Sequence, residues 1–191
     1  MGNRGVLHDG SRRVVAAWRL TRWITCVLCW KDRRRAVFAP NRYSELFFLD
    51  EATSLSAGHR PCAECRRPRY LEFRAAWDAG RRGRDAAPRF LRADEIDRVL
   101  HAERLDREGR KKTYRAALSS LPDGTMVERA GAPHLVWGGT LRPWSFGGYG
   151  PAVPPALHEQ VDVLTPRSIV GAIGAGFVPQ VAGVSQAVTE G

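Results

Sequence analysis

The sequence predicts an α+β protein in which a small four-cysteine module of strands and short helices precedes a helix and a small antiparallel β-unit. Three observations support this prediction. The four cysteines form two C-x-x-C pairs within the first 65 of 191 residues. Apolar side chains at helical spacing follow the second pair. From about residue 118, short β-rich segments alternate with turns that contain glycine or proline, a pattern typical of an antiparallel meander.

By composition the chain divides into five segments. We expect, in order, an irregular amino-terminal arm, the cysteine module, a charged linker, a domain with a helix and a β-meander, and a disordered tail: 1–22, 23–80, 81–90, 91–181 and 182–191. No segment contains the roughly 18 uninterrupted apolar residues of a membrane helix, or the apolar core of a secretory signal. We therefore expect a cytoplasmic protein without membrane contact, in which cysteines stay reduced.

Within the module, short strands are expected to precede one short helix. Residues 23–25 favour a strand that leads into the first cysteine pair, and residues 36–38 follow it as a second strand. Residues 46–49, Leu-Phe-Phe-Leu, form the most apolar run of the chain and predict a buried strand. Asp50 suits the N-cap of a helix over residues 51–57, because its carboxylate can accept from free backbone amides of the first turn.

Two longer helices are expected after the second cysteine pair. Pro68 suits the first turn of the first helix, along which Tyr70, Phe73 and Trp77 form one apolar stripe. Asp94 stands where it can cap the second helix. The segment between the two helices combines charge, glycine and proline without a period, which is typical of a linker.

The β-unit is expected to contain strands at residues 125–129, 134–137, 140–144 and 161–164. Turns that contain glycine separate the first three, so these should pair as antiparallel neighbours. A Thr-Pro dipeptide after the fourth strand supplies an N-cap and a first-turn residue for a helix over residues 167–175.

The cysteine spacing indicates a metal site. Structural Zn²⁺ takes four ligands in a closed tetrahedron, and two C-x-x-C turns supply two thiolates each. We therefore expect Cys26, Cys29, Cys62 and Cys65 to bind zinc. His59 is an alternative fourth ligand if Cys29 points away. Buried structural thiols or a redox pair are the remaining alternatives, although neither pair opens a helix within a βαβ pattern.

The net charge of +10 points to a nucleic-acid partner, because clustered cations gain affinity by releasing counterions from phosphates. The candidate contacts to DNA or RNA are the arginines that flank the two cysteine pairs: Arg33, Arg34, Arg35, Arg66, Arg67 and Arg69. The alternative is that the charge is compositional. Lysine occurs at only three positions, so arginine carries nearly all of the positive charge.

Other chemistry has weaker support. The chain contains no metalloprotease helix motif, no P-loop, no dinucleotide fingerprint and no nucleophile elbow. Trp137, Trp144, Phe146 and Tyr149 gather in the β-unit, where aromatic rings can stack on unpaired bases. Aromatic side chains of a small sheet more often form its core, and we prefer that interpretation.

The stretch FFLDEATSLSAGHRPCAEC resembles the second half of the Ada-type zinc-binding domain, the metal-binding domain of the Ada DNA-repair protein family. The likeness covers about residues 23–78 and implies a zinc site formed by Cys26, Cys29, Cys62 and Cys65. In the DNA-repair members, one cysteine of the first pair also accepts methyl groups from DNA phosphotriesters, which by position indicates Cys26. The first pair departs from the family pattern, because two residues separate its cysteines where the repair proteins have three.

These observations lead to three hypotheses. The first is a zinc-binding protein that faces nucleic acid and uses its zinc structurally. The second is an enzyme with a reactive zinc-bound cysteine, which in the Ada-like form is a methyl acceptor in DNA repair. The third is a zinc-stabilised adaptor for a protein partner, with an arginine-rich surface that is only compositional.

Overall fold

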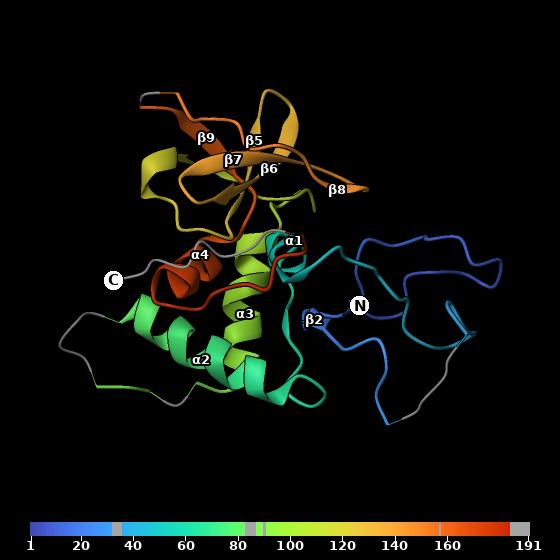
Figure 1. The fold of residues 1–191 in the computed structure, drawn as a ribbon. Helices are drawn as coiled ribbons and strands as arrows, with labels where there is room; N and C mark the ends of the chain where they lie inside the picture. The colour runs from blue at the N-terminus through green and yellow to red at the C-terminus, as the bar shows by residue number, and fades with distance from the viewer. Residues whose placement is uncertain (32–35, 83–86, 90, 157, 184–191) are drawn as a thin grey trace.

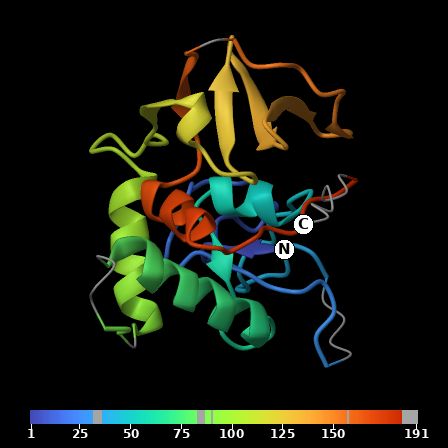
Figure 2. The same cartoon turned by 60° about the vertical axis from the view of Figure 1, so that its left-hand side comes forward.

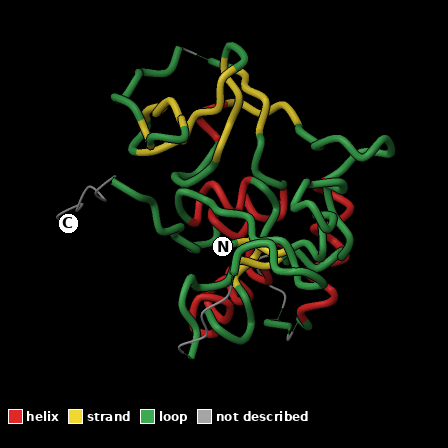
Figure 3. The backbone as a smooth tube through the Cα atoms, turned by 90° about the vertical axis from the view of Figure 1, so that its right-hand side faces the viewer, coloured by secondary structure: helices red, strands yellow, loops and turns green. Residues whose placement is uncertain are grey.

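A computed structural model describes residues 1–31, 36–82, 87–89, 91–156 and 158–183, and it has the predicted α+β architecture. A six-stranded sheet lies at one end of the molecule, and helices lie beneath it (Figure 1). The view in Figure 2 keeps the sheet above the helices, so the two form separate layers. Amino-terminal segments and a small three-stranded sheet form a third part beside the helices, and loops make up much of it (Figure 3).

The small sheet joins segments that are distant in the sequence. Strand β1 (Gly2–Asn3) pairs antiparallel with β2 (Ile24–Thr25), which pairs parallel with β3 (Arg60–Pro61). The first strand comes from the arm that we expected to be irregular. Two residues with no alternation of apolar side chains give too weak a pattern to be recognised before the partner strand is known.

Helix α1 (Glu51–Ser56) confirms the expected short helix and its cap. The Thr53 amide donates to the Asp50 carboxylate at 2.9 Å, and the Asp50 amide donates to the Thr53 hydroxyl at 3.1 Å. Gly58 follows the helix with φ +82°, a left-handed conformation that glycine adopts without a steric penalty. The chain then turns directly into β3.

The strand expected at residues 36–38 is absent from the described structure, which has a turn there. Phe38 adopts φ +55°, a left-handed conformation that does not continue a strand. Its amide donates to the Glu45 carboxylate at 2.9 Å, and its ring stacks on His8 at a centroid distance of 4.7 Å. Tertiary contacts therefore override the local β preference of this segment.

The buried strand expected at residues 46–49 is also wrong. Only Leu46 makes a strand-like contact, an isolated bridge to Gly2, within the described residues. Phe47 is 61% exposed and Leu49 is 38% exposed. The run is apolar, but it lies at the margin of the small sheet, where no further strand pairs with it in the described chain.

Three helices share one core. Helix α2 (Arg67–Arg81) buries the predicted stripe of Tyr70, Phe73 and Trp77. Helices α3 (Ala93–Arg104) and α4 (Arg167–Gly174) pack with it. This core contains buried residues on both sides of the linker expected at 81–90, so the helices of the two expected domains form one hydrophobic cluster: Leu55, Phe73, Ala76, Trp77, Ile96, Leu100, Ile169, Ala172, Ile173 and Phe177.

The large sheet confirms the predicted meander. Its order is β4-β9-β5-β6-β7-β8, with antiparallel neighbours throughout. The strands are β4 (Tyr114–Ala117), β5 (Met126–Arg129), β6 (Ala132–Trp137), β7 (Thr140–Ser145), β8 (Gly148–Tyr149) and β9 (Gln160–Val163). Edge strands β4 and β8 are additions to the prediction, since both are short and lack an alternating pattern.

Helix α1 connects the sheet to the cysteine module. Ala52 packs with Met126, Leu135 and Trp137 of the sheet. The hydroxyl of Tyr149 donates to the Asp50 carboxylate at 2.9 Å.

Of the tail expected to be disordered, residues 184–191 lie outside the described residues. The amide of Ala182, just before them, donates to Asp50 at 3.1 Å. None of the described helices is long and apolar enough to cross a bilayer.

Candidate metal centre

Parallel pairing of β2 and β3 brings the two cysteine pairs together. Ile24 lies opposite Arg60 and Thr25 lies opposite Pro61, so both strands end at the same edge of the small sheet. The next residue of each strand is a cysteine, Cys26 or Cys62. The Cys62 amide donates to the Thr25 carbonyl at 2.9 Å, which extends the pairing to the second cysteine pair.

Three thiols converge at this edge. The sulfur atoms of Cys26, Cys62 and Cys65 all lie within 4.8 Å of one another, close enough to hold a metal ion. Tetrahedral zinc with Zn–S bonds of about 2.3 Å needs sulfurs about 3.8 Å apart, so a small side-chain adjustment brings the three into ligand geometry. Cys62 is buried, and Cys26 and Cys65 are half-buried. The cluster is thus shielded from solvent on one side and open on the other.

The other two candidate ligands lie outside this cluster. Cys29 is exposed, although it is only three residues from Cys26. His59 is fully buried in a different environment, where its ring packs on Phe48 at a centroid distance of 4.8 Å. Its Nε2 accepts a hydrogen bond from Arg4 Nε at 3.2 Å. The structure therefore brings together three of the four predicted thiols and does not bring the histidine to them.

Hydrogen bonds connect the three thiols. The Cys26 thiol donates to Cys62, and backbone amides of Cys65 and Glu64 also donate there, which lowers the pKa of Cys62 to about 5. The same hydrogen bond, together with burial, raises the pKa of Cys26. Burial raises the pKa of Cys65. Binding of a soft divalent cation would displace the thiol protons, because thiolates are the metal ligands.

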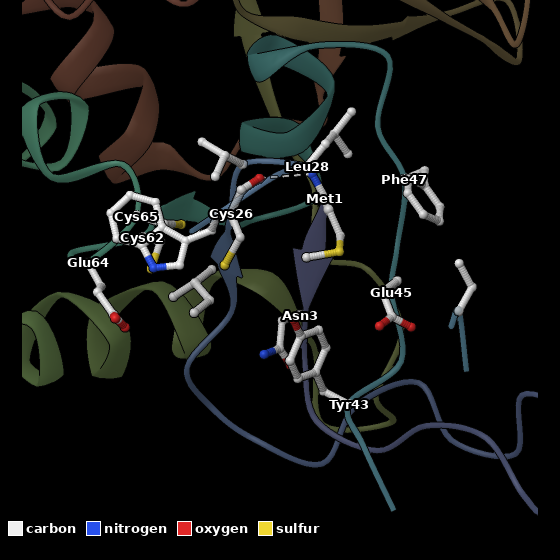
Figure 4. A pocket seen from close by; sticks show the side chains of 14 residues that line it. Met1, Asn3, Cys26, Leu28, Tyr43, Glu45, Phe47, Cys62, Glu64 and Cys65 are labelled. Atoms are coloured by element: carbon white, nitrogen blue, oxygen red, sulfur yellow. Dashed lines mark hydrogen bonds between the residues drawn. The ribbon is translucent and has the colours of Figure 1, made fainter. Parts of the chain in front are cut away.

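A cavity of about 510 Å³ opens onto the thiols (Figure 4). Cys26, Cys62 and Cys65 form part of one wall, and Glu45 and Phe47 lie across from them. The sequence predicts Phe47 within a buried strand at residues 46–49 and Glu45 directly before it, so it does not predict that the two residues line a cavity. No local pattern distinguishes a cavity wall from a strand in such a short apolar run.

The candidate arginines have different surroundings. Arg66 and Arg69 form ion pairs with the buried carboxylate of Glu51, at 3.2 and 2.5 Å. Arg69 also pairs with Glu72 and donates to the Val178 carbonyl. Arg67 is exposed. The remaining candidates lie outside the described residues: Arg33, Arg34 and Arg35.

The aromatic side chains of the sheet are mainly structural. Trp137 is 7% exposed and belongs to the core that α1 shares with the sheet. Trp144 and Tyr149 pack against the same core. Phe146, at 97% exposed, is the exception among these four rings. The preferred interpretation of the cluster as a β-core therefore agrees with the packing of three of its members.

Two sets of contacts by buried and half-buried cationic side chains lie at β2 and β3, the strands that lead to the cysteines, and neither set is predicted from the sequence. Trp23, just before β2, packs against the guanidinium groups of Arg4 and Arg104, whose carbons are 3.8 and 4.7 Å from its ring centroid. Arg60 of β3 pairs with Asp97 of α3 at 2.7 Å. Each contact joins residues more than 15 positions apart, so no local motif announces it.

Comparison with known proteins adds no assignment: no protein-family model, no curated protein and no solved structure matches this chain.

Proposed function

We propose that this chain is a zinc-binding protein in which Cys26, Cys62 and Cys65 hold the ion. The observation that carries the proposal is the convergence of three thiols from two separate turns within 4.8 Å. Thiolate ligands favour zinc over the hard cations magnesium and calcium. Four free cysteines suit a reducing compartment, so the proposal keeps the cytoplasm as the location.

Three protein ligands leave one position of a tetrahedral ion for water or a bound molecule. A structural site would instead close that position with a fourth protein ligand. Cys29 is the nearest candidate in sequence, but it is exposed and lies outside the cluster. We therefore propose that Cys29 is not a zinc ligand, in contrast to the other three cysteines.

Metal analysis of the purified protein tests this assignment. We expect close to one equivalent of zinc in the wild type, and a loss of most of it in Cys62→Ser and Cys65→Ser. Cys29→Ser is the matched control and should retain the zinc. A wild-type protein without zinc would refute the proposal, whereas an equal loss in Cys29→Ser would indicate a closed four-cysteine site.

A reactive cysteine is a second candidate function, because Cys26 lines the cavity. In this role its sulfur would take a methyl group from a methylated phosphotriester in DNA, leaving the phosphodiester. Zinc ligation supports such chemistry by keeping the sulfur as a thiolate. Intact-mass measurement after incubation with methylated DNA should then show one added methyl group in the wild type and none in Cys26→Ala.

Binding of DNA or RNA rests on the net charge of +10. Among the described candidate arginines, Arg67 is the one with an exposed side chain, and Arg66 and Arg69 already pair with Glu51. Retention on DNA or RNA at low salt, released as salt rises, tests this partner. Capture of proteins without nucleic acid would favour the adaptor hypothesis instead.

A further inference from the structure

The cavity beside the three cysteines is acidic in a strongly basic chain. Glu45 and Glu64 lie among its described lining residues, which include no lysine, arginine or histidine side chain. The α-ammonium group of Met1 is turned to the Cys26 carbonyl, to which it donates at 3.1 Å (Figure 4).

Glu45 supplies a buried carboxylate to this cavity. The residue is only 7% exposed, and its Oε2 accepts from the Phe38 amide at 2.9 Å. A carboxylate withdrawn from water is stabilised when a cation or hydrogen-bond donors approach it. Glu64, near the cysteine side, is exposed and adds a second negative charge at the mouth of the same cavity.

The rest of the lining is apolar and aromatic. Trp30, Tyr43 and Phe47 contribute rings, and the Met1 thioether contributes a polarisable surface. Phe47 is 61% exposed, so its ring is accessible to a molecule in the cavity. Aromatic faces attract cations, and rings next to carboxylates are the usual means by which proteins recognise organic ammonium groups.

From these observations we infer that the cavity binds an organic ammonium ion with an apolar body. The ammonium group pairs with the buried carboxylate of Glu45, and the apolar body lies against Phe47 and the neighbouring rings. Glu64, near the cysteine side, adds negative charge that favours a cation over an anion in the cavity. The volume of about 510 Å³ is in the range of pockets for small molecules. This inference goes beyond metal binding, because the two carboxylates and the rings recognise the ligand whether or not the thiols hold an ion.

Three probes of nearly equal shape and different charge test the inference: phenethylamine, phenethyl alcohol and hydrocinnamate. Binding is measured at neutral pH by titration calorimetry and by tryptophan fluorescence, to which Trp30 in the cavity contributes. We expect phenethylamine to bind, the neutral alcohol to bind at least about tenfold more weakly, and the anion not to bind. Absence of phenethylamine binding, or equal binding of all three probes, would overturn the inference.

Variants of cavity residues test whether phenethylamine binds in this cavity. Glu45→Gln should weaken phenethylamine binding about tenfold, and Phe47→Ala should weaken it as well. The controls are Glu128→Gln on an exposed position of β5 and Phe146→Ala at the 97% exposed ring, neither of which lines the cavity. If Glu45→Gln does not fold, Glu64→Gln at its exposed position replaces it. Equal affinities in cavity and control variants would refute the assignment.

Zinc content is measured in the same samples, so the two proposals fail separately. If a protein without zinc binds the amine, the zinc proposal is refuted and the proposal of an ammonium site in the cavity stands. If the protein holds one equivalent of zinc but does not bind the amine, the ammonium site is refuted and the zinc proposal stands.

Discussion

Arg60 donates from Nε and Nη2 to the two carboxylate oxygens of Asp97, at 2.9 and 2.7 Å, and both side chains are buried. Arg60 belongs to β3, two residues before Cys62, and Asp97 belongs to α3. The pair therefore holds the strand that carries the second cysteine pair against the helical core. Removing one member of such a pair leaves an uncompensated buried charge, which costs more than the intact pair contributes.

We expect Asp97→Ala to lower the free energy of unfolding by about 3–5 kcal/mol. Asp94→Ala, on the same helix, is the control. Asp94 is the second residue of α3 rather than its expected cap, its side chain is 58% exposed, and its ion pair with Arg92 lies on the surface. That change should cost less than about 1 kcal/mol. Urea unfolding followed by circular dichroism measures both values, and equal losses in the two variants would contradict the buried role of Asp97.

Comparison of Arg69→Ala with Arg67→Ala should distinguish an arginine that stabilises the fold from one that is free to contact nucleic acid. Arg69 pairs with Glu51, whose side chain is 2% exposed, so Arg69→Ala should cost about 1–3 kcal/mol of unfolding free energy. Arg67 is exposed, so Arg67→Ala should change stability by less than about 0.5 kcal/mol.

If Arg67 contacts a phosphate, its removal should reduce the slope of log affinity against log salt by about one. The slope comes from titrations of a DNA duplex at several salt concentrations. A slope that is unchanged in Arg67→Ala would remove this residue from the candidate interface.

Sequence reasoning succeeded where the determinants are local. Asp50 and Thr53 cap α1 through contacts three residues apart, and the apolar stripe of α2 follows from helical periodicity. It failed for residues 36–38 and 46–49, where the backbone conformation depends on partners elsewhere in the chain. A run such as Leu-Phe-Phe-Leu has the composition of a strand, but only a neighbouring strand makes it one.

The candidate site also has local features that the sequence predicts and long-range features that it does not. The cysteine spacing indicates four candidate metal ligands, but it does not show which of them lie together, because the two members of a C-x-x-C pair look alike in the sequence. The parallel register of β2 and β3 decides that Cys26 meets Cys62, and that register is a long-range property. The acidic cavity combines Glu45, Phe47 and Trp30 with the cysteines, and no single segment contains this combination.

Helices α2 and α4 approach each other closely at Gly80. A Cβ atom on Gly80 would overlap the carbonyl group of Gly171. Glycine-to-alanine changes in helices usually stabilise by up to about 1 kcal/mol. Here we expect the opposite sign, a loss of about 1–3 kcal/mol in Gly80→Ala, because two helix backbones must separate. Gly174→Ala is the matched control, since a Cβ there would meet only a Pro122 side-chain atom at 4.0 Å. Thermal unfolding should show a lower Tm for the first variant and an unchanged or higher Tm for the second.

His59 should make the protein sensitive to acid. Burial, and then the charges of Arg4 and Arg104, hold the pKa of His59 well below its usual 6.5. As the pH falls through 6.5, the unfolded chain binds a proton that the folded protein does not, so folding stability decreases toward the pKa of the folded state. Between pH 7 and pH 5 this residue alone should remove up to about 2 kcal/mol from the unfolding free energy.

His59→Gln tests this linkage, because a glutamine oxygen can accept the Arg4 hydrogen bond but does not titrate. Unfolding free energies of the wild type and the variant are compared at pH 5, 6 and 7. The wild type should lose about 2 kcal/mol more than the variant on acidification, and the exposed His158→Gln control should follow the wild type. The comparison between proteins removes the contribution of the thiols, which titrate equally in all three. Parallel pH profiles for the wild type and His59→Gln would show that His59 takes up its proton in the folded protein as readily as in the unfolded chain.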